Sequence, residues 1–415
     1  MKFYIETYGC TANFGNSLDM AESLQKLGHI PSPLDEADIV IVNTCIVTEK
    51  TERKILQRLQ LLQGERLVVA GCLPAALPES IRNIVCKRLG LLSGSAAVSV
   101  SDLFGNSLSR TYEAGKNIAL SPEIEDLCGI VNIAEGCNGV CSYCIVRMAR
   151  GRLVSRKFDD VVCDVEKLAA RGLVEIQVSA QDTAAYGSDL GTNLAELLER
   201  LIQVPGDFRL RVGMMNPNSA LRIQEELIRA FHSPKIYQFL HIPVQSGSDR
   251  ILQSMGRRYS ARDFMNIVDA FRSDHPNITV ITDVIVGFPG ETDLDFIATM
   301  DLVETLQPDK VNVTKFSRRP GTAAARLYDM PDRIKKDRSR EITRLWQKIA
   351  AQRNRRYQGE VLNAVVTECG RRGTMKARAG NYLGIVVRGI PLLGSHIRVE
   401  VTETNPFFVY GREVD

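Results

Sequence analysis

Three cysteines lie close together near the middle of the chain, at Cys137, Cys141 and Cys144, directly after a predicted strand at 130–134. Zinc motifs usually contain two C-x-x-C pairs, or one such pair followed by a pair of histidines. This segment has a single C-x-x-C, at Cys141 and Cys144, and no following histidine pair. Three thiolates instead match a [4Fe–4S] cluster in which one iron lacks a protein ligand, so that a small molecule can bind there. A structural zinc site or a chance cluster is the alternative interpretation.

The other cysteines are spread along the chain, which contains ten in 415 residues. That is too sparse for a disulfide-stapled secreted scaffold. The N-terminus has no apolar run of signal-peptide length, and no apolar stretch approaches the ~20 residues that a membrane helix needs. We therefore expect a cytoplasmic protein with reduced thiols and no membrane contact, whose clustered cysteines serve metal or redox chemistry.

Three more cysteines each follow a predicted strand in the first part of the chain. Cys10, Cys45 and Cys72 come after strands expected at 3–7, 39–42 and 67–70. Helical patterns separate these strands, so they should form a parallel sheet whose carboxyl ends share one edge. The first pattern places one apolar helix face at Leu18, Ala21, Leu24 and Leu27. The cysteines should meet at that edge as a second three-thiolate site; three unconnected core cysteines are the alternative.

The middle of the chain predicts an incomplete barrel. Strands are expected at 130–134, 174–179, 208–212, 237–242, 279–286 and 310–314, and helical patterns lie between them. Six β/α units fit an incomplete (β/α)6 barrel of the TIM type better than an open sheet, and in such barrels the loops after the strands carry the chemistry. The fold class is therefore α/β.

The C-terminal part is basic and predicts a different fold. Residues 333–415 contain 17 Lys and Arg against 8 Asp and Glu, which leaves residues 1–332 acidic. A basic helix is expected over 333–356, followed by five short β segments that suggest a small five-stranded barrel. Such an asymmetry favours an anionic partner, nucleic acid first, although a solvated charged helix face is the alternative.

The cysteine motif and its surroundings resemble a known family. The C-x-x-x-C-x-x-C segment is similar to the signature of the radical S-adenosylmethionine (SAM) superfamily, and its flanks resemble the methylthiotransferases. The C-terminal barrel is similar to the RNA-binding TRAM domain. The matching segments are 7–13, 43–45, 71–72, 135–152, 181–187, 240–248 and 283–292.

The resemblance implies three domains, a cofactor set and a reaction. The domains are an N-terminal cluster-binding domain over 1–128, a radical SAM domain over 129–352 and a TRAM-like domain over 353–415. Two [4Fe–4S] clusters are implied, one on Cys10, Cys45 and Cys72 and the other on Cys137, Cys141 and Cys144. SAM bound to the second cluster would give a 5′-deoxyadenosyl radical. The N-terminal cluster would supply sulfur, and a second SAM would supply the methyl group.

Within the family, the segments 6–13 and 211–217 look most like the archaeal and eukaryotic tRNA branch. That branch converts N6-threonylcarbamoyladenosine, next to the anticodon, to its 2-methylthio form. We therefore expect tRNA as partner, a one-electron donor such as ferredoxin or flavodoxin, and a sulfur donor of unknown kind. The alternatives are another modified tRNA adenosine, a ribosomal protein residue as substrate, or a non-enzymatic RNA-binding iron–sulfur protein. The chain ends without the membrane anchor of many eukaryotic members, which favours an archaeal or bacterial cytosol.

Further residues are candidates for binding SAM, substrate or RNA, because they lie on loops after barrel strands or in the basic C-terminal part. His241, in an apolar strand, is interpreted as a core histidine. Each candidate loop residue could instead cap a turn or fill space. The candidates for SAM or substrate are Tyr143, Gln181, Asp182, Asn216, Gln245, Gly287 and Glu291. Those for RNA are Arg353, Arg355, Arg356, Arg371, Arg372, Lys376 and Arg378, with Tyr382 and Phe408 for stacking.

Overall fold

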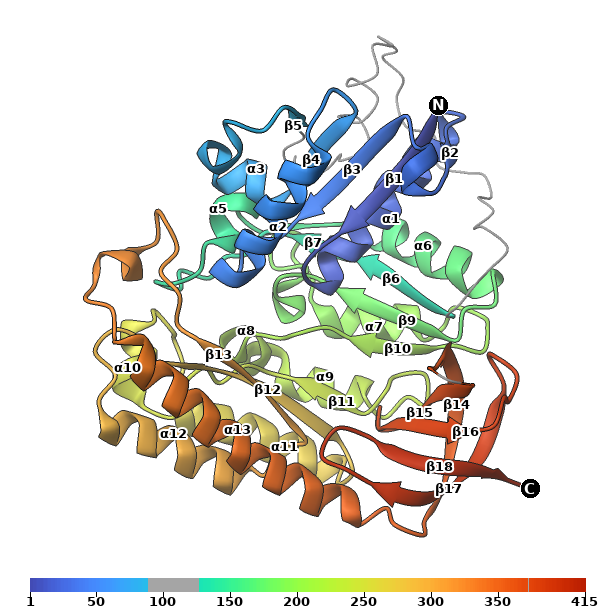
Figure 1. The fold of residues 1–415 in the computed structure, drawn as a ribbon. Coiled ribbons are helices and arrows are strands. Elements are labelled where there is room, and N and C mark those ends of the chain that lie inside the picture. The colour runs from blue at the N-terminus through green and yellow to red at the C-terminus, as the bar shows by residue number, and fades with distance from the viewer. Residues whose placement is uncertain (89–126, 372) are drawn as a thin grey trace.

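The computed structural model describes residues 1–88, 127–371 and 373–415. Its N-terminal part is a five-stranded parallel sheet in the order β2-β1-β3-β4-β5 (Figure 1). The strands are β1 (Lys2–Thr7), β2 (Ile30–Pro31), β3 (Ile39–Thr44), β4 (Leu67–Gly71) and β5 (Lys87–Arg88). The α-helices are α1 (Thr11–Lys26), α2 (Glu49–Leu62) and α3 (Cys72–Ala76), with 3₁₀ turns η1 (Leu34–Glu36) and η2 (Pro78–Ile81). The predicted parallel sheet is confirmed.

Helix α1 differs from the amphipathic helix that its leucines predict. Leu18 and Leu27 are 45% and 52% exposed, so the predicted apolar face is wrong at these two positions. The buried face carries small and polar residues instead, because α1 packs closely against β6 (Cys128–Asn132) of the next domain as well as against its own sheet. A Cβ atom at Gly15 would lie 2.5 Å from Asn132 Nδ2, and that amide donates to the Ala12 carbonyl at 3.1 Å.

Six parallel strands form the predicted incomplete barrel. They run in two three-stranded groups, β10-β9-β6 and β11-β12-β13, which are joined where Leu210 bridges to Ile236. The further strands are β9 (Glu175–Ser179), β10 (Arg209–Val212), β11 (Phe239–His241), β12 (Thr279–Val286) and β13 (Lys310–Lys315). A short antiparallel pair, β7 (Ala134–Glu135) with β8 (Val154–Ser155), follows β6.

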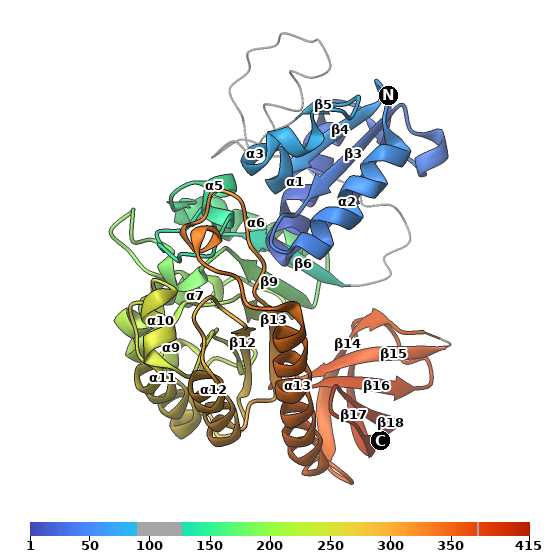
Figure 2. The ribbon, with the colours of Figure 1, turned by 60° about the vertical axis from the view of Figure 1, so that its left-hand side comes forward.

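Helices cover the outer face of the barrel strands (Figures 1 and 2). Val280, Val284 and Val286 of β12 are fully buried in the large hydrophobic core that these helices share with the strands. The alternate residue Asp283 is one of those that line an interior cavity. The helices are α5 (Val146–Arg150), α6 (Phe158–Ala170), α7 (Leu194–Leu201), α8 (Pro217–Ala220), α9 (Gln224–Ala230), α10 (Asp249–Ser254), α11 (Ala261–Asp274) and α12 (Asp293–Leu306). The 3₁₀ turns are η3 (Thr183–Ala185), η4 (Leu221–Ile223) and η5 (Ala323–Arg326).

A long helix leads to the C-terminal barrel. Helix α13 (Asp332–Arg355) packs along β13 and beside the C-terminal strands, as Figure 2 shows. Five strands then form a closed barrel in the order β14-β15-β16-β18-β17, as the sequence predicts. They are β14 (Val361–Cys369), β15 (Thr374–Ala379), β16 (Gly384–Arg388), β17 (His396–Thr404) and β18 (Val409–Val414).

Tyr382 docks this small barrel against the amino ends of the six-stranded barrel. Its hydroxyl donates to Glu175, the first residue of β9, at 2.8 Å. Its ring centroid lies 4.9 Å from that of Tyr237 and 4.7 Å from that of Phe239. Tyr382 has φ +66°, a left-handed conformation that a tyrosine rarely adopts, so tertiary contacts hold this turn. The structure thus gives Tyr382 a docking role in place of the expected RNA stacking.

Candidate functional site

The loop with Cys137, Cys141 and Cys144 is held by backbone contacts to the segment that follows α5. Gly136 has φ +77°, and a Cβ atom there would lie 1.9 Å from the Arg152 carbonyl oxygen. The position therefore admits only glycine. Cys137 N–H donates to the Gly151 carbonyl at 3.2 Å, and the N–H of Gly139 donates to the Cys137 sulfur at 3.2 Å. These contacts hold the start of the cysteine loop and place a backbone donor on the Cys137 sulfur.

The three N-terminal cysteines lie at one edge of their sheet. β1, β3 and β4 are neighbours in the parallel sheet, and Cys10, Cys45 and Cys72 follow their carboxyl ends. Cys10 precedes α1 and Cys72 begins α3. A Cβ atom at Gly9 would lie 2.8 Å from Cys45 Cβ, so the backbone before Cys10 passes directly over Cys45. The edge predicted from the sequence is therefore present.

Both cysteine groups border the same cavity, which has a volume of about 800 Å³. Cys137, Cys141 and Cys144 line it from the barrel, and Cys10 lines it from the N-terminal sheet. Exposed apolar side chains contribute to the lining from both domains: Val47, Val140 and Met148. Polar strand residues complete it from the barrel interior: Arg211, His241 and Asp283.

The cysteine groups provide the kind of donor that an iron–sulfur cluster uses. Among the residues that the structure describes, no three His, Cys, Asp or Glu side chains are grouped closely enough to hold one ion. The thiolates of a [4Fe–4S] cluster bind different irons and so surround a larger group. Burial raises the pKa of Cys137 and of Cys72 to about 11, so both are neutral thiols until a metal displaces their protons. The donor set therefore fits the cluster, and ligation by the six cysteines stays a prediction.

Arg150 connects the two cysteine groups. It ends α5, six residues after Cys144, and its side chain is 1% exposed. Its guanidinium donates to Asn13 Oδ1 at 2.5 Å and to Asn16 Oδ1 at 2.9 Å, both on α1, and pairs with Glu135 at 2.6 Å. The Cys72 sulfur contacts the same Asn13 Oδ1 at 4.0 Å. One buried cation therefore lies between the two domains, beside the N-terminal cysteine group.

Gln181 is the candidate SAM contact with the clearest ligand-facing geometry. It lines the large cavity, and its Oε1 accepts from Gly136 N–H at 2.7 Å, directly before Cys137. This donor fixes the amide orientation. Its Nε2 is buried and has no partner among the described residues. A buried amide donor without a partner is costly unless a ligand accepts from it.

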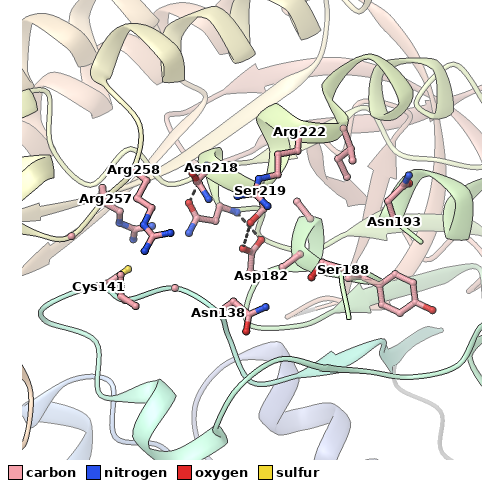
Figure 3. A pocket seen from close by; sticks show the side chains of 18 of the residues that line it. Asn138, Cys141, Asp182, Ser188, Asn193, Asn218, Ser219, Arg222, Arg257 and Arg258 are labelled. Carbon is pink, nitrogen blue, oxygen red and sulfur yellow. Dashed lines mark hydrogen bonds between the residues drawn. The ribbon is translucent and has the colours of Figure 1, made fainter. Parts of the chain in front are cut away.

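Asp182 and Asn216 lie in a second, smaller hollow beside the cysteine loop (Figure 3). Asp182 accepts from Asn216 N–H at 2.9 Å and from the Ser219 hydroxyl at 2.7 Å. Complete burial raises its pKa, against these hydrogen bonds. The Asn216 side chain caps α8 through Asn218 N–H at 3.2 Å. Both residues thus shape loops on the barrel rim, and their contact with SAM stays a prediction.

The remaining candidates for SAM contact have mostly internal contacts. Tyr143 packs edge-on against Phe288. Gly287 N–H donates to Glu291 at 2.7 Å, and Glu291 pairs with Arg338 of α13 at 2.5 Å. Gln245 has φ +70°, and its buried Oε1 has no partner among the described residues. None of these contacts tests SAM binding.

Sequence reasoning missed a polar group in the barrel interior. His241 Nε2 lies 3.1 Å from Asp283, and the Asn312 amide donates to the same carboxylate at 2.7 Å. Despite burial, the hydrogen bond and charge of His241 keep the pKa of Asp283 below its ordinary value. Arg211 lies beside Phe239, 4.8 Å from the ring centroid. The available signal was Asp283, the one charged residue in the strand at 279–286.

The RNA candidates differ in whether their side chains already have partners within the protein. Arg353 pairs with Asp309 at 2.8 Å, and Lys376 pairs with Glu368 at 2.7 Å. Arg378 lies 4.7 Å from the Tyr382 ring centroid in the domain interface. Arg356 lies over the Tyr357 ring and is exposed, as are Arg355 and Arg371. Arg372 lies outside the described residues. RNA contact by this set stays a prediction.

Two family models match the chain. Residues 131–303 match the Radical SAM superfamily, and residues 2–89 match the Uncharacterized protein family UPF0004. Among solved structures, the radical S-adenosylmethionine methyltransferase TsrM from Kitasatospora setae has a TM-score of 0.57 at 14% identity, covering 78% of this chain and 77% of that one. At this identity the likeness concerns the fold.

Similar proteins cover nearly the whole chain. A probable threonylcarbamoyladenosine tRNA methylthiotransferase of Archaeoglobus fulgidus is 40% identical over 99% of this chain and 98% of its own length. The threonylcarbamoyladenosine tRNA methylthiotransferase MtaB of Thermotoga maritima is 36% identical over 80% and 79%. The human threonylcarbamoyladenosine tRNA methylthiotransferase is 33% identical over 100% of this chain and 74% of its own. Among the described residues, no helix is long and apolar enough to cross a membrane.

Proposed function

This chain belongs to the radical SAM methylthiotransferases, and from that membership we propose that it modifies tRNA. The substrate is N6-threonylcarbamoyladenosine next to the anticodon, and the reaction replaces the hydrogen at C2 by a methylthio group. The names of relatives that match 80% to 100% of the chain support this substrate. A cytoplasmic location, and a ferredoxin or flavodoxin as electron donor, are parts of the same proposal.

The observation that carries the proposal is the shared cavity. Cys10 borders it from the N-terminal domain, and Cys137, Cys141 and Cys144 border it from the barrel. A reaction that takes sulfur from one site and radical chemistry from another needs both sites next to one substrate atom. A volume of about 800 Å³ is within the usual range for small-molecule and cofactor sites.

Each cysteine group would hold one [4Fe–4S] cluster, Cys10, Cys45 and Cys72 the first, and Cys137, Cys141 and Cys144 the second. When bound, the clusters and two molecules of SAM per turnover supply the radical, the sulfur and the methyl group. The protein's own part is positioning. The apolar residues Val47, Val140 and Met148 provide surface for a purine ring, and the Gln181 amide provides a donor for a ligand carboxylate or carbonyl.

The C-terminal part would hold the tRNA itself. Exposed basic residues such as Arg355 and Arg371 can contact phosphates, which position RNA without reading its sequence. The division into domains at 1–128, 129–352 and 353–415 belongs to the proposal, although α13 continues through residue 352 to Arg355.

The proposal is tested with reconstituted protein, a reductant, methyl-labelled SAM and tRNA that carries N6-threonylcarbamoyladenosine. Nucleoside mass spectrometry should detect labelled 2-methylthio-N6-threonylcarbamoyladenosine. tRNA with unmodified adenosine is the control substrate. Release of 5′-deoxyadenosine without a methylthio nucleoside would point to another substrate. No release from fully loaded protein would support a non-enzymatic role.

A further inference from the structure

A second hollow, of about 200 Å³, opens on the barrel rim beside the cavity. It is built by the loops after β9 and β10, by the cysteine loop and by the turn after α10 (Figure 3). The two share Gly139, Val140 and Cys141. Only the segment Gly139–Cys141 would therefore separate a ligand in the hollow from the large cavity.

The hollow has an excess of positive charge. Arg222, Arg257 and Arg258 line it, and Asp182 is the one acid among its described lining residues. The Asp182 carboxylate already accepts two hydrogen bonds, from the Asn216 backbone and the Ser219 hydroxyl.

Two of these arginines are available to a ligand. Arg257 is held by the Tyr143 hydroxyl. Arg222 and Arg258 are exposed, and neither forms an ion pair with an acid in the described part of the chain. Figure 3 shows both side chains at the hollow, which Asn218 also lines. Two guanidinium groups without acidic partners, next to a side-chain amide, match the donor pattern that proteins use for phosphate.

We propose that this hollow binds a phosphodiester group of the RNA strand that carries the target adenosine. The inference rests on the proposed tRNA substrate. Because the hollow adjoins the cysteine loop, the phosphate belongs to a nucleotide that directly flanks the adenosine. Arg222 and Arg258 hold it, and the adenosine enters the large cavity on the other side of Gly139–Cys141.

The test measures the affinity of an anticodon stem-loop RNA that carries N6-threonylcarbamoyladenosine. Arg222→Ala with Arg258→Ala should weaken binding about tenfold. The slope of log affinity against log salt should become shallower by about 0.7 for each lost contact. Arg200→Ala with Arg229→Ala removes the same charge from exposed positions on α7 and α9 that line neither hollow. This control should keep the wild-type affinity and slope.

A second measurement locates the contact. Stem-loops with one neutral methylphosphonate at a linkage flanking the adenosine should bind the wild-type protein more weakly than the all-phosphate stem-loop does. The double variant should bind both stem-loops with the same affinity. Suppose that the wild-type protein binds and modifies the RNA and that the double variant binds the RNA with the same affinity. This result would overturn the phosphate site and leave the proposed function standing. Loss of SAM affinity at unchanged RNA affinity would also overturn it. Wild-type protein that neither binds nor modifies the RNA would defeat the proposed function as well.

Discussion

The Arg150 guanidinium donates to Asn16 Oδ1 at 2.9 Å across the boundary between the six-stranded barrel and the N-terminal sheet. The same group contacts Asn13 and Glu135 and is almost fully buried. Because α5 begins two residues after Cys144 and ends at Arg150, and Asn13 contacts Cys72, this contact links the two cysteine groups. A buried, hydrogen-bonded cation therefore contributes to the relative position of the domains, together with the packing of α1 against β6.

Arg150→Met should lower the free energy of unfolding by about 3 kcal/mol, because it leaves the Glu135 carboxylate buried without its cation. Denaturant unfolding of apo-protein measures this effect. Arg152→Met is the matched control, since Arg152 lies two residues away and is exposed. An Arg150 variant as stable as the control would contradict the docking role.

Iron analysis tests whether the cysteine groups are independent. Two clusters should give about eight irons and eight sulfides per chain. Replacing Cys137, Cys141 and Cys144 by Ala should remove about half, and so should the triple replacement of Cys10, Cys45 and Cys72. The control triple variant, Cys86→Ala, Cys163→Ala and Cys369→Ala, should keep all the iron. If either test variant loses all its iron, or none, the two-site arrangement is wrong.

Gln181 should contribute to ligand binding through its unpartnered amide. Gln181→Glu keeps an acceptor for Gly136 N–H but loses the Nε2 donor. We expect about tenfold weaker SAM or substrate binding, the effect of one lost charge-assisted hydrogen bond. Equilibrium dialysis on cluster-loaded protein measures the affinity, and the iron content verifies that the cluster is intact. Unchanged affinity for both ligands would show that the amide faces neither.

Tyr382 should hold the C-terminal barrel in place. Tyr382→Ala should lower the free energy of unfolding by about 3 kcal/mol, because it removes the ring that packs against Tyr237 and Phe239. Tyr382→Phe should lower the free energy of unfolding by only about 1 kcal/mol. The Glu175 Oε1 atom keeps a donor in this variant, because Gln177 also donates to it. Thermal unfolding measures the loss of stability, and limited proteolysis near residues 356–360 measures the loss of docking of the C-terminal barrel. Tyr328→Ala, at a residue that is 84% exposed, should change neither.

Local patterns predicted the elements well, and contacts between domains poorly. The alternation of buried strands and amphipathic helices predicted both sheets, and parallel pairing placed Cys10, Cys45 and Cys72 at one edge. Helix α1 departed from its leucine pattern because a second domain packs on its small and polar face. The contacts of Arg150 with Asn13 and of Tyr382 with Glu175 join residues 137 and 207 positions apart. No local periodicity carries information about such pairs.

Nucleoside analysis of cellular tRNA tests the central claim most directly. The organism's gene for this chain is deleted, and total tRNA is digested and measured by mass spectrometry. We expect 2-methylthio-N6-threonylcarbamoyladenosine to disappear, N6-threonylcarbamoyladenosine to accumulate, and the wild-type gene but not its Cys10→Ala form to restore the product. A deletion strain in which every methylthio-adenosine remains at its wild-type level would contradict the account.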